Sequence, residues 1–302
     1  MKIAITGSTG LVGTETVNHF KSQGHEVTRL VRPETNYEGS DLCLEWDAEN
    51  GVKRLEYLDG HNVVIHLAGA NLANERWSAK YKDELYASRV NATSALCHSL
   101  AQLRNPPKVV FSASAVGYYG HRAPDKSIDE AGARGKDFLA ELCYRWEEAT
   151  DPAKKAGIRV VNLRMGMVLS RHGGALAKML PVFQKGLGGK LGSGEQMISW
   201  ITIDEIPAVI DFLIGKENIL GPVNVVSPNP VSNADFTKML GNALGKPATL
   251  PVPAFGVRMM FGEMADILLL NGAKVLPRRL LELRYWFKYP DLEAALSHCL
   301  SA

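Results

Sequence analysis

The chain lacks the features typical of secreted, membrane-spanning or nucleic-acid-binding proteins. Its four cysteines are scattered without a Cys-x-x-Cys spacing, which indicates reduced, mostly buried thiols rather than a disulfide framework. No apolar run approaches the ~20 residues of a membrane helix, and Thr and Gly interrupt the apolar N-terminus, unlike in a signal peptide. The net charge of +2 gives no reason to expect nucleic acid or an anionic membrane as partner. We therefore expect a cytoplasmic protein without membrane or nucleic-acid partners and without a metal site.

The chain does have the composition of an ordinary globular protein. Of its 302 residues, 46% are hydrophobic and 22% charged, enough for one large domain with a smaller lobe. Apolar strand patterns alternate with helical patterns as far as Met165, and these are Lys2–Thr6, Leu11–Ser22, Val27–Val31, Asn62–Leu67, 79–104, Lys108–Ser112, 136–156 and Arg159–Met165. This alternation predicts an α/β fold built on a doubly wound parallel sheet.

Three glycines follow the first predicted strand. Gly7, Gly10 and Gly13 have the spacing Gly-x-x-Gly-x-x-Gly and lead into the helix Leu11–Ser22. They allow a tight turn, close approach of a ligand to the backbone, and flat packing of the helix on the sheet. The N–H groups and positive dipole end of the helix favour a pyrophosphate. An ordinary strand-to-helix turn is the alternative, but the position of the loop between a strand and an amphipathic helix favours a dinucleotide site.

The end of the second strand indicates which dinucleotide binds. An NAD site places a carboxylate there, about 20 residues past the glycines, to bind the ribose 2′-hydroxyl. Here the chain reads Leu30-Val31-Arg32-Pro33, with no acid. Arg32, with Arg29 as a second candidate, is placed for a 2′-phosphate, and a charged hydrogen bond of ~1.5–3 kcal/mol favours NADP over NAD about ten- to a hundredfold. The alternative is a solvated Arg32 beside a proline turn; we expect NADP(H).

The third core strand and the helix after it add polar candidates. His66 lies inside an apolar run, where a hydrogen-bonded structural histidine is favoured over a catalytic one. Ala68 and Gly69 follow, where the backbone must pass close to a cofactor. Glu84 and Arg89 lie early in the helix 79–104, either on a solvated face or, for Arg89, against the cofactor.

Hydroxyl groups follow the fourth core strand. Ser114, Tyr118 and Tyr119 come after Lys108–Ser112, and the carboxyl end of a parallel strand faces the ligand crevice. Further on, seven glycines over residues 170–196 suit caps, turns or a mobile loop over a pocket. Asp204 is the expected N-cap of a helix Glu205–Ile214.

These runs resemble the extended short-chain dehydrogenase/reductase family of epimerases, dehydratases and reductases. A closer resemblance is to its atypical branch, the "epimerase family" proteins of the YfcH type. The runs that carry the resemblance are TGSTGLVG, HLAGA, FSASAVGYYG, WITIDEI and PVNVVSP, then Arg76-Trp77, FLAEL-C-x-x-WE at Phe138–Glu147, GLGGKLGSGEQMISWI at Gly186–Ile201 and GEMAD at Gly262–Asp266.

The resemblance implies an NADP-binding Rossmann domain and a second lobe for substrate. We expect the Rossmann domain over 1–168, with 198–226 returning to its sheet, and a smaller, mostly helical C-terminal lobe over 169–197 and 227–302. Parent-family members often dimerise through helices that correspond to 79–104 and 136–156, so a homodimer is the expectation here. The expected cofactor contacts are Gly7, Thr9, Gly10, Leu11, Val12, Gly13, Val31, Arg32, Leu67, Ala68, Gly69, Glu84, Arg89, Met167 and Val168.

The chain departs from the parent family at its catalytic residues. That family uses a serine or threonine with a Tyr-x-x-x-Lys pair at the start of a helix, where the tyrosine is the acid/base. Here Phe138 and Leu142 stand at the two positions of that pair, and only Ser114 remains. Loss of an acid/base typically costs about 10²–10⁴ in rate. Tyr118 and Tyr119 are the candidate replacements, with packing as the alternative for each, and Lys136 is a weaker candidate.

Two functions follow from this pattern. One is an NADP(H)-dependent oxidoreductase or epimerase for a small carbonyl or sugar-like substrate, in which Ser114 binds the substrate oxygen and Tyr118 or Tyr119 gives the proton. The other is a catalytically silent NADP(H)-binding protein that controls or scaffolds a partner, which the missing Tyr-Lys pair favours.

Overall fold

The computed structural model describes residues 1–35, 37 and 39–301. Within them, an eight-stranded sheet has the order β12-β8-β6-β5-β1-β2-β3-β4, parallel throughout except that β4 is antiparallel to β3. Its strands are β1 (Lys2–Thr6), β2 (Glu26–Val31), β3 (Leu42–Asp47), β4 (Gly51–Val52), β5 (Val63–His66), β6 (Val109–Ala115), β8 (Arg159–Met165) and β12 (Gly221–Val225). The predicted doubly wound sheet is confirmed, and its order reverses between β1 and β5, where ligands bind in such folds.

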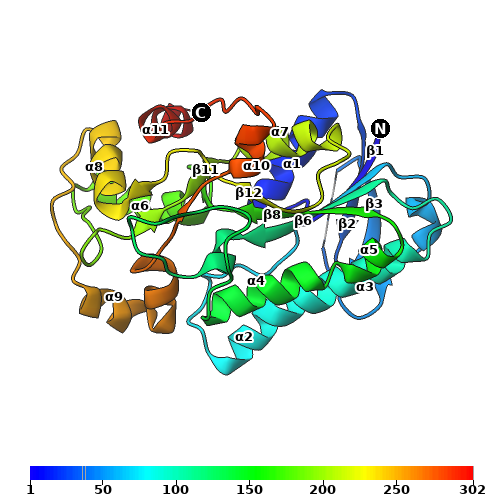
Figure 1. Ribbon diagram of the computed structural model, residues 1–302, viewed down its shortest axis with the longest axis horizontal. Helices are drawn as coiled ribbons and strands as arrows, with labels where there is room; N and C mark the ends of the chain where they lie inside the picture. Colours follow the sequence, from blue (N-terminus) through cyan, green and yellow to red (C-terminus); the bar gives the residue numbers. More distant parts are fainter. Residues whose placement is uncertain (36, 38, 302) are drawn as a thin grey trace.

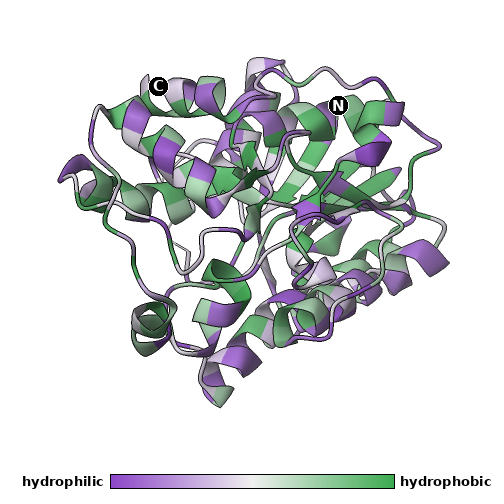
Figure 2. Cartoon of the chain, turned by 60° about the vertical axis from the view of Figure 1, so that its left-hand side comes forward, coloured by the Kyte–Doolittle hydropathy of each residue, from purple (hydrophilic) through white to green (hydrophobic). Residues whose placement is uncertain are grey.

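Helices cover both faces of the sheet (Figure 1). Those described are α1 (Leu11–Ser22), α2 (Ala79–Tyr86), α3 (Ala92–Ala101), α4 (Phe138–Glu148), α5 (Asp151–Lys155), α6 (Gly174–Gln184), α7 (Glu205–Ile214), α8 (Asn233–Leu244), α9 (Ala254–Phe261), α10 (Arg278–Glu282) and α11 (Leu292–Ser301). Alternate strand residues face opposite sides: Ile3 and Ile5 pack with α1 and α7, whereas Ala4 and Val64 pack with α3. Figure 2 shows the same division, with hydrophobic residues on the strands and on the helix faces toward them.

A smaller, mostly helical lobe lies beside one end of the sheet, with α6, α8 and α9 on the left of Figure 1. Helices α6, α8 and α11 share an apolar cluster that includes the fully buried Trp200. The short strands here and in the connections are β7 (Ser127–Ile128), β9 (Met167–Leu169), β10 (Met197–Ile198), β11 (Trp200–Thr202), β13 (Val231–Ser232) and β14 (Lys274–Val275). Of the segment 198–226, β12 joins the main sheet beside β8, whereas β11 pairs with β9 outside it.

Two helices expected to be continuous are interrupted. The helix predicted over 79–104 is α2 and α3 joined by a π-helical turn, η2 (Ala87–Asn91), which carries Arg89. The helix predicted over 136–156 is α4 followed by α5. Pro152 explains the second break, because a proline inside a helix lacks the N–H donor and collides with the preceding turn. The remaining short turns are η1 (Leu55–Leu58), η3 (Val116–Tyr119) and η4 (Ala265–Leu269).

Asp204 and the glycine-rich run after α6 both contact segments that are distant in the sequence. Asp204 is the N-cap of α7, as predicted, but its side chain makes no cap hydrogen bond. Its Oδ2 atom lies instead 3.2 Å from Nε2 of His298 in α11. The glycine-rich run after α6 lies along residues 250–252, where the N–H groups of Leu250 and Val252 donate to the carbonyls of Gly188 and Lys190.

Candidate functional site

The glycine loop forms a cradle at the N-terminus of α1. Gly7 has a φ of 64°, and a Cβ atom on Gly13 would lie 2.0 Å from the Gly7 carbonyl oxygen, so neither position accepts a side chain. Gly10 is the N-cap of α1, without a side-chain cap or an acid in the first turn. The N–H groups of that turn are therefore available to a ligand. The Ser8 hydroxyl in this loop is buried without a partner among the described residues, which also fits an oxygen-rich anion such as a diphosphate.

The two arginines of β2 and its end have different surroundings. Arg29 is buried, and its guanidinium donates to Oδ2 of Asp41 at 2.8 Å and to the Ser8 carbonyl at 2.7 Å. Burial alone would raise the pKa of Asp41, but hydrogen bonds from Lys21 and Arg29 outweigh it and hold this pKa well below its usual range. Arg32 is 72% exposed, with Nε 3.2 Å from Oε1 of Glu34. Arg29 thus braces the glycine loop, whereas Arg32 is accessible at the strand end, after the buried Val31.

The loop after β5 is held at both ends by side chains. The N–H groups of Leu67 and Ala68 donate to Oγ1 of Thr6 at 3.1 and 3.3 Å. At the other end, Ser88 Oγ accepts from the Ala70 N–H at 3.2 Å, and Arg89 donates to the Ala70 carbonyl at 2.8 Å. Ser88 and Arg89 reach this loop from the π-helical turn η2. Gly69, at the middle of the loop, is exposed.

Arg89 is a buried cation without a carboxylate. It makes no ion pair among the described residues, and its hydrogen bonds go to backbone carbonyls of Leu85 and Ala70. Its guanidinium lies 5.1 Å from the centre of the Trp146 ring, and burial lowers its pKa. Because an uncompensated buried charge is costly, this site fits an anionic or oxygen-rich ligand.

The remaining expected cofactor contacts surround this crevice less closely. Thr9 and Glu84 are exposed, and Glu84 makes no hydrogen bond or ion pair among the described residues. Leu11, Val12, Met167 and Val168 are half-buried. The segment of Met167 and Val168 leads to Gly173, on which a Cβ atom would lie 3.0 Å from the Leu11 side chain. This places the turn before α6 beside the start of α1.

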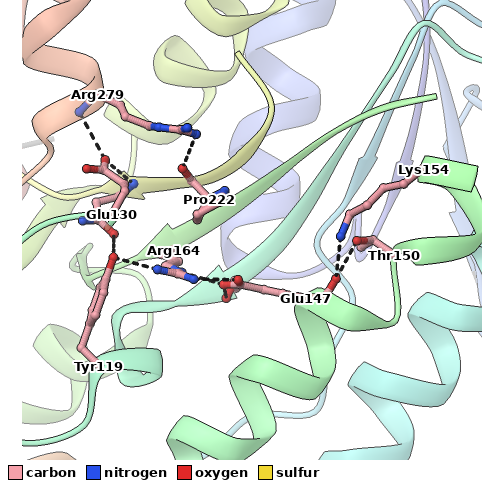
Figure 3. A network of polar contacts seen from close by, with 10 residues as sticks. Tyr119, Glu130, Glu147, Thr150, Lys154, Arg164, Pro222 and Arg279 are labelled. Atoms are coloured by element: carbon pink, nitrogen blue, oxygen red, sulfur yellow. Dashed lines mark hydrogen bonds and ion pairs between the residues drawn. The ribbon is translucent and has the colours of Figure 1, made fainter. Parts of the chain in front are cut away.

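Ser114 belongs to a buried ionic network. Figure 3 shows Glu147, Arg164 and Tyr119 of this network. The Ser114 hydroxyl donates to Oε1 of Glu147 at 2.7 Å. Glu147 also accepts from Arg164 through both oxygens, at 2.7 and 2.8 Å. Arg164 donates further to the Tyr119 hydroxyl at 2.9 Å, which in turn donates to Oδ1 of Asn224 at 2.7 Å. The Ser114 proton is therefore committed to Glu147, and the Tyr119 proton to Asn224.

The same network continues to the edge of the sheet. Oε1 of Glu130 accepts from the Asn224 N–H at 3.0 Å, and Arg279 donates to the Pro222 carbonyl at 2.8 Å. Figure 3 shows the side chains of Glu130 and Arg279 beside Pro222 of β12. Burial raises the pKa of Tyr119 to about 12. Tyr119 thus links Arg164 of β8 to Asn224 of β12 through its hydroxyl group, and its raised pKa keeps that hydroxyl protonated.

Tyr118 differs from its neighbour. It is half-buried, and its hydroxyl makes no hydrogen bond among the described residues. The Arg164 guanidinium lies 3.5 Å from the centre of its ring, and Tyr119 packs edge-on against it at 5.4 Å. The ring is therefore fixed in place, while the hydroxyl group is available to a ligand.

The positions of the family's Tyr-Lys pair are filled by apolar packing. Phe138 and Leu142 lie in a cluster with Trp77 and Leu139, and the Phe138 and Trp77 rings are 5.2 Å apart. Lys136 is exposed and precedes α4, whose N-cap is Asp137.

Sequence reasoning missed Glu147, Arg164 and Trp146. One signal for the first two was present: Arg164 lies within the apolar strand pattern Arg159–Met165, and most buried arginines are paired with a carboxylate. Which carboxylate meets it depends on how α4 packs on β6 and β8. No group of three or more His, Cys, Asp or Glu residues is placed to hold a metal ion in the described ranges, and no helix there is long and apolar enough to cross a membrane.

Comparison with solved structures adds a close relative. The chain superposes on human epimerase family protein SDR39U1 (isoform 2), solved with NADPH, with a TM-score of 0.89 and 32% identity over 100% of this chain and 99% of that one. More distant is MoeE5 in complex with UDP-glucose and NAD, at 18% identity and a TM-score of 0.79, which shows likeness of fold alone.

Sequence comparison agrees with this result. An epimerase family protein of Mycobacterium bovis is 39% identical over 98% of this chain and 96% of its own length. The chloroplastic SDR39U1 homologue of Arabidopsis thaliana is 37% identical over 98% of this chain and 86% of its own. Residues 252–299 match a domain of unknown function, DUF1731. Residues 3–226 match the NAD dependent epimerase/dehydratase family, and the chain belongs to that family.

Proposed function

We propose that the protein binds NADP(H), with the diphosphate on the first turn of α1 and the 2′-phosphate at Arg32. The observation that carries this proposal is the N-terminus of α1 at the loop of Gly7, Gly10 and Gly13, which has no side-chain cap and no acidic residue in its first turn. The exposed guanidinium of Arg32 favours NADP(H) over NAD(H), because residues 30–33 contain no carboxylate for a 2′-hydroxyl and the next acid, Glu34, pairs with Arg32. Arg89, which is buried and has no acidic partner among the described residues, supports binding of an oxygen-rich ligand at the loop after β5.

We further propose that the protein is an oxidoreductase or epimerase of a small carbonyl or sugar-like substrate, with Tyr118 as the proton donor. A bound nicotinamide cofactor would supply or accept the hydride. Tyr118 is favoured over Tyr119 because its hydroxyl is uncommitted, whereas that of Tyr119 donates to Asn224. In this arrangement Ser114, whose proton is held by Glu147, offers a ligand only its lone pairs.

A catalytically silent NADP(H)-binding protein is the second candidate. It is favoured by the apolar packing of Phe138 and Leu142, where the parent family holds its acid/base pair. In this case occupancy by the cofactor, rather than turnover, would control a partner.

Fluorescence titration with NADPH and NADH, followed by a screen of carbonyl and alcohol substrates, tests these proposals. We expect tight NADPH binding and turnover that falls about 10²–10⁴-fold in Tyr118→Phe. The exposed Tyr57 in η1 offers a control, Tyr57→Phe, that should keep full activity. NADPH binding without turnover of any substrate would select the silent protein, and absence of binding would refute both.

A further inference from the structure

The loop after β5, residues 67–70, is hydrogen-bonded to the Thr6 hydroxyl, and the buried His66 ring contacts the same hydroxyl. Both N–H groups at the start of the loop, of Leu67 and Ala68, donate to Oγ1 of Thr6. The Leu67 N–H is shared with the Thr6 backbone carbonyl, at 3.3 Å, whereas the Ala68 N–H has Oγ1 of Thr6 as its acceptor among the described residues. The same Oγ1 atom lies 2.7 Å from Nδ1 of His66. All of these atoms belong to the switch point between β1 and β5, and both side chains are fully buried.

Counting donors assigns the tautomer of His66. A hydroxyl oxygen has two lone pairs and one proton, and both lone pairs of Thr6 accept loop N–H groups. The Thr6 proton therefore goes to Nδ1 of His66, which must be unprotonated. The ring proton then lies on Nε2, 2.9 Å from Oγ1 of Thr93. Burial lowers the pKa of His66 to about 4, so the ring is neutral near pH 7.

The contacts continue from His66 to the far end of the loop. Thr93 in α3 also accepts from Nε1 of Trp146 at 2.9 Å. The Trp146 ring lies beneath the Arg89 guanidinium, and Arg89 donates to the Ala70 carbonyl. Four buried side chains behind Thr6, those of His66, Thr93, Trp146 and Arg89, thus connect the first and last residues of the loop 67–70.

We propose that His66, as the neutral Nε2–H tautomer, is a positioning residue that sets the loop 67–70 for the dinucleotide by holding the Thr6 hydroxyl as a double acceptor. A second ring proton on Nδ1 would put three donors on two lone pairs of Thr6 and release one loop amide. This inference rests on the proposed cofactor site, to which it adds a residue outside the expected contacts.

The chain contains a matched control. His61 makes the same kind of buried hydrogen bond through Nε2 to Oγ1 of Thr28, at 2.9 Å, and its Nδ1 faces the Leu58 carbonyl at 3.1 Å. This second Thr–His pair makes no hydrogen bond to the loop 67–70 among the described residues. His66→Phe removes a contact to two buried threonines, Thr6 and Thr93, and His61→Phe a contact to one, Thr28. Only the loss of His66 should disturb the loop.

The experiment compares wild type, His66→Phe and His61→Phe. We expect the ¹⁵N shifts of His66 in the wild type to show Nε2–H and a bare Nδ1. In His66→Phe, we expect the Ala68 amide to exchange about tenfold faster or more, since Leu67 keeps its bond to the Thr6 carbonyl, and NADPH to bind about tenfold more weakly or worse. In His61→Phe, amide exchange in this loop and NADPH binding should stay at the wild-type values.

Three results would overturn the proposal. They are an Nδ1–H or charged His66 ring, unchanged exchange at Ala68 in His66→Phe, and equal losses of NADPH affinity in both variants. The NMR measurement uses the wild type and stays decisive if His66→Phe does not fold. If the wild type does not bind NADPH, the proposed function fails, while the tautomer and exchange results still decide the role of His66.

Discussion

Replacement of Arg32 by alanine should weaken NADPH binding selectively. Arg32 is the exposed cation at the end of β2, whereas Arg29 is committed to Asp41 and the Ser8 carbonyl. A charged hydrogen bond to phosphate contributes ~1.5–3 kcal/mol. Because the Arg32 side chain is 72% exposed and pairs with Glu34, solvent screening favours the low end of that range. About 1.4 kcal/mol corresponds to a tenfold change, so we expect about a tenfold rise in the Kd of NADPH.

The same geometry predicts a change of opposite sign at Glu34. Its Oε1 atom lies 3.2 Å from Nε of Arg32 and competes with a phosphate for that cation. Glu34→Gln should therefore tighten NADPH binding and leave NADH binding unchanged, whereas Arg32→Glu should weaken NADPH far more than NADH.

Fluorescence titration of both nucleotides at low and high salt measures these effects. The control is Arg278→Ala, since Arg278 is another exposed arginine, at 63%, and pairs with Glu282 in α10 and with Asp129. Equal losses of NADPH and NADH affinity in Arg32→Ala, or NADPH binding in Glu34→Gln no tighter than in wild type, would refute the assignment of the 2′-phosphate to Arg32.

Three other predictions follow from buried contacts. His66 has a pKa of about 4 in the folded chain against 6.5 when unfolded, so the unfolded state binds more protons between these values. The free energy of unfolding in urea should fall by up to about 3 kcal/mol as the pH drops from ~6.5 to ~4, and this component should be absent in His66→Phe. Glu147→Gln leaves the buried Arg164 without a carboxylate and should cost about 3–5 kcal/mol in the same assay; a cost below 1 kcal/mol would contradict the ion pair. In Gly13→Ala the new Cβ would lie 2.0 Å from the Gly7 carbonyl oxygen, so calorimetry should detect no NADPH binding, or a melting temperature lowered by several degrees.

Local patterns predicted much of the Rossmann half of the molecule. The strands at Lys2–Thr6 and Arg159–Met165 and the helix at Leu11–Ser22 have the predicted bounds. They could be predicted because their apolar periodicity and their glycine or polar boundaries lie within one short stretch of chain. The π-helical turn at Ala87–Asn91 left no such signal, since its residues are compatible with an ordinary helix.

The sequence by itself therefore determined the parallel sheet, the glycine loop at its first turn, the absence of an acid at residues 30–33 and the absence of the Tyr-x-x-x-Lys pair. Only the folded chain decided that Ser114 donates to Glu147, that Tyr119 is committed while Tyr118 is not, and that His66 stands behind the loop 67–70. The physical reason is distance along the chain. Hydrogen-bond partners 33 residues apart, as in Ser114 and Glu147, or 60 apart, as in Thr6 and His66, meet only after helices pack on the sheet, and burial then requires each polar group to find a partner.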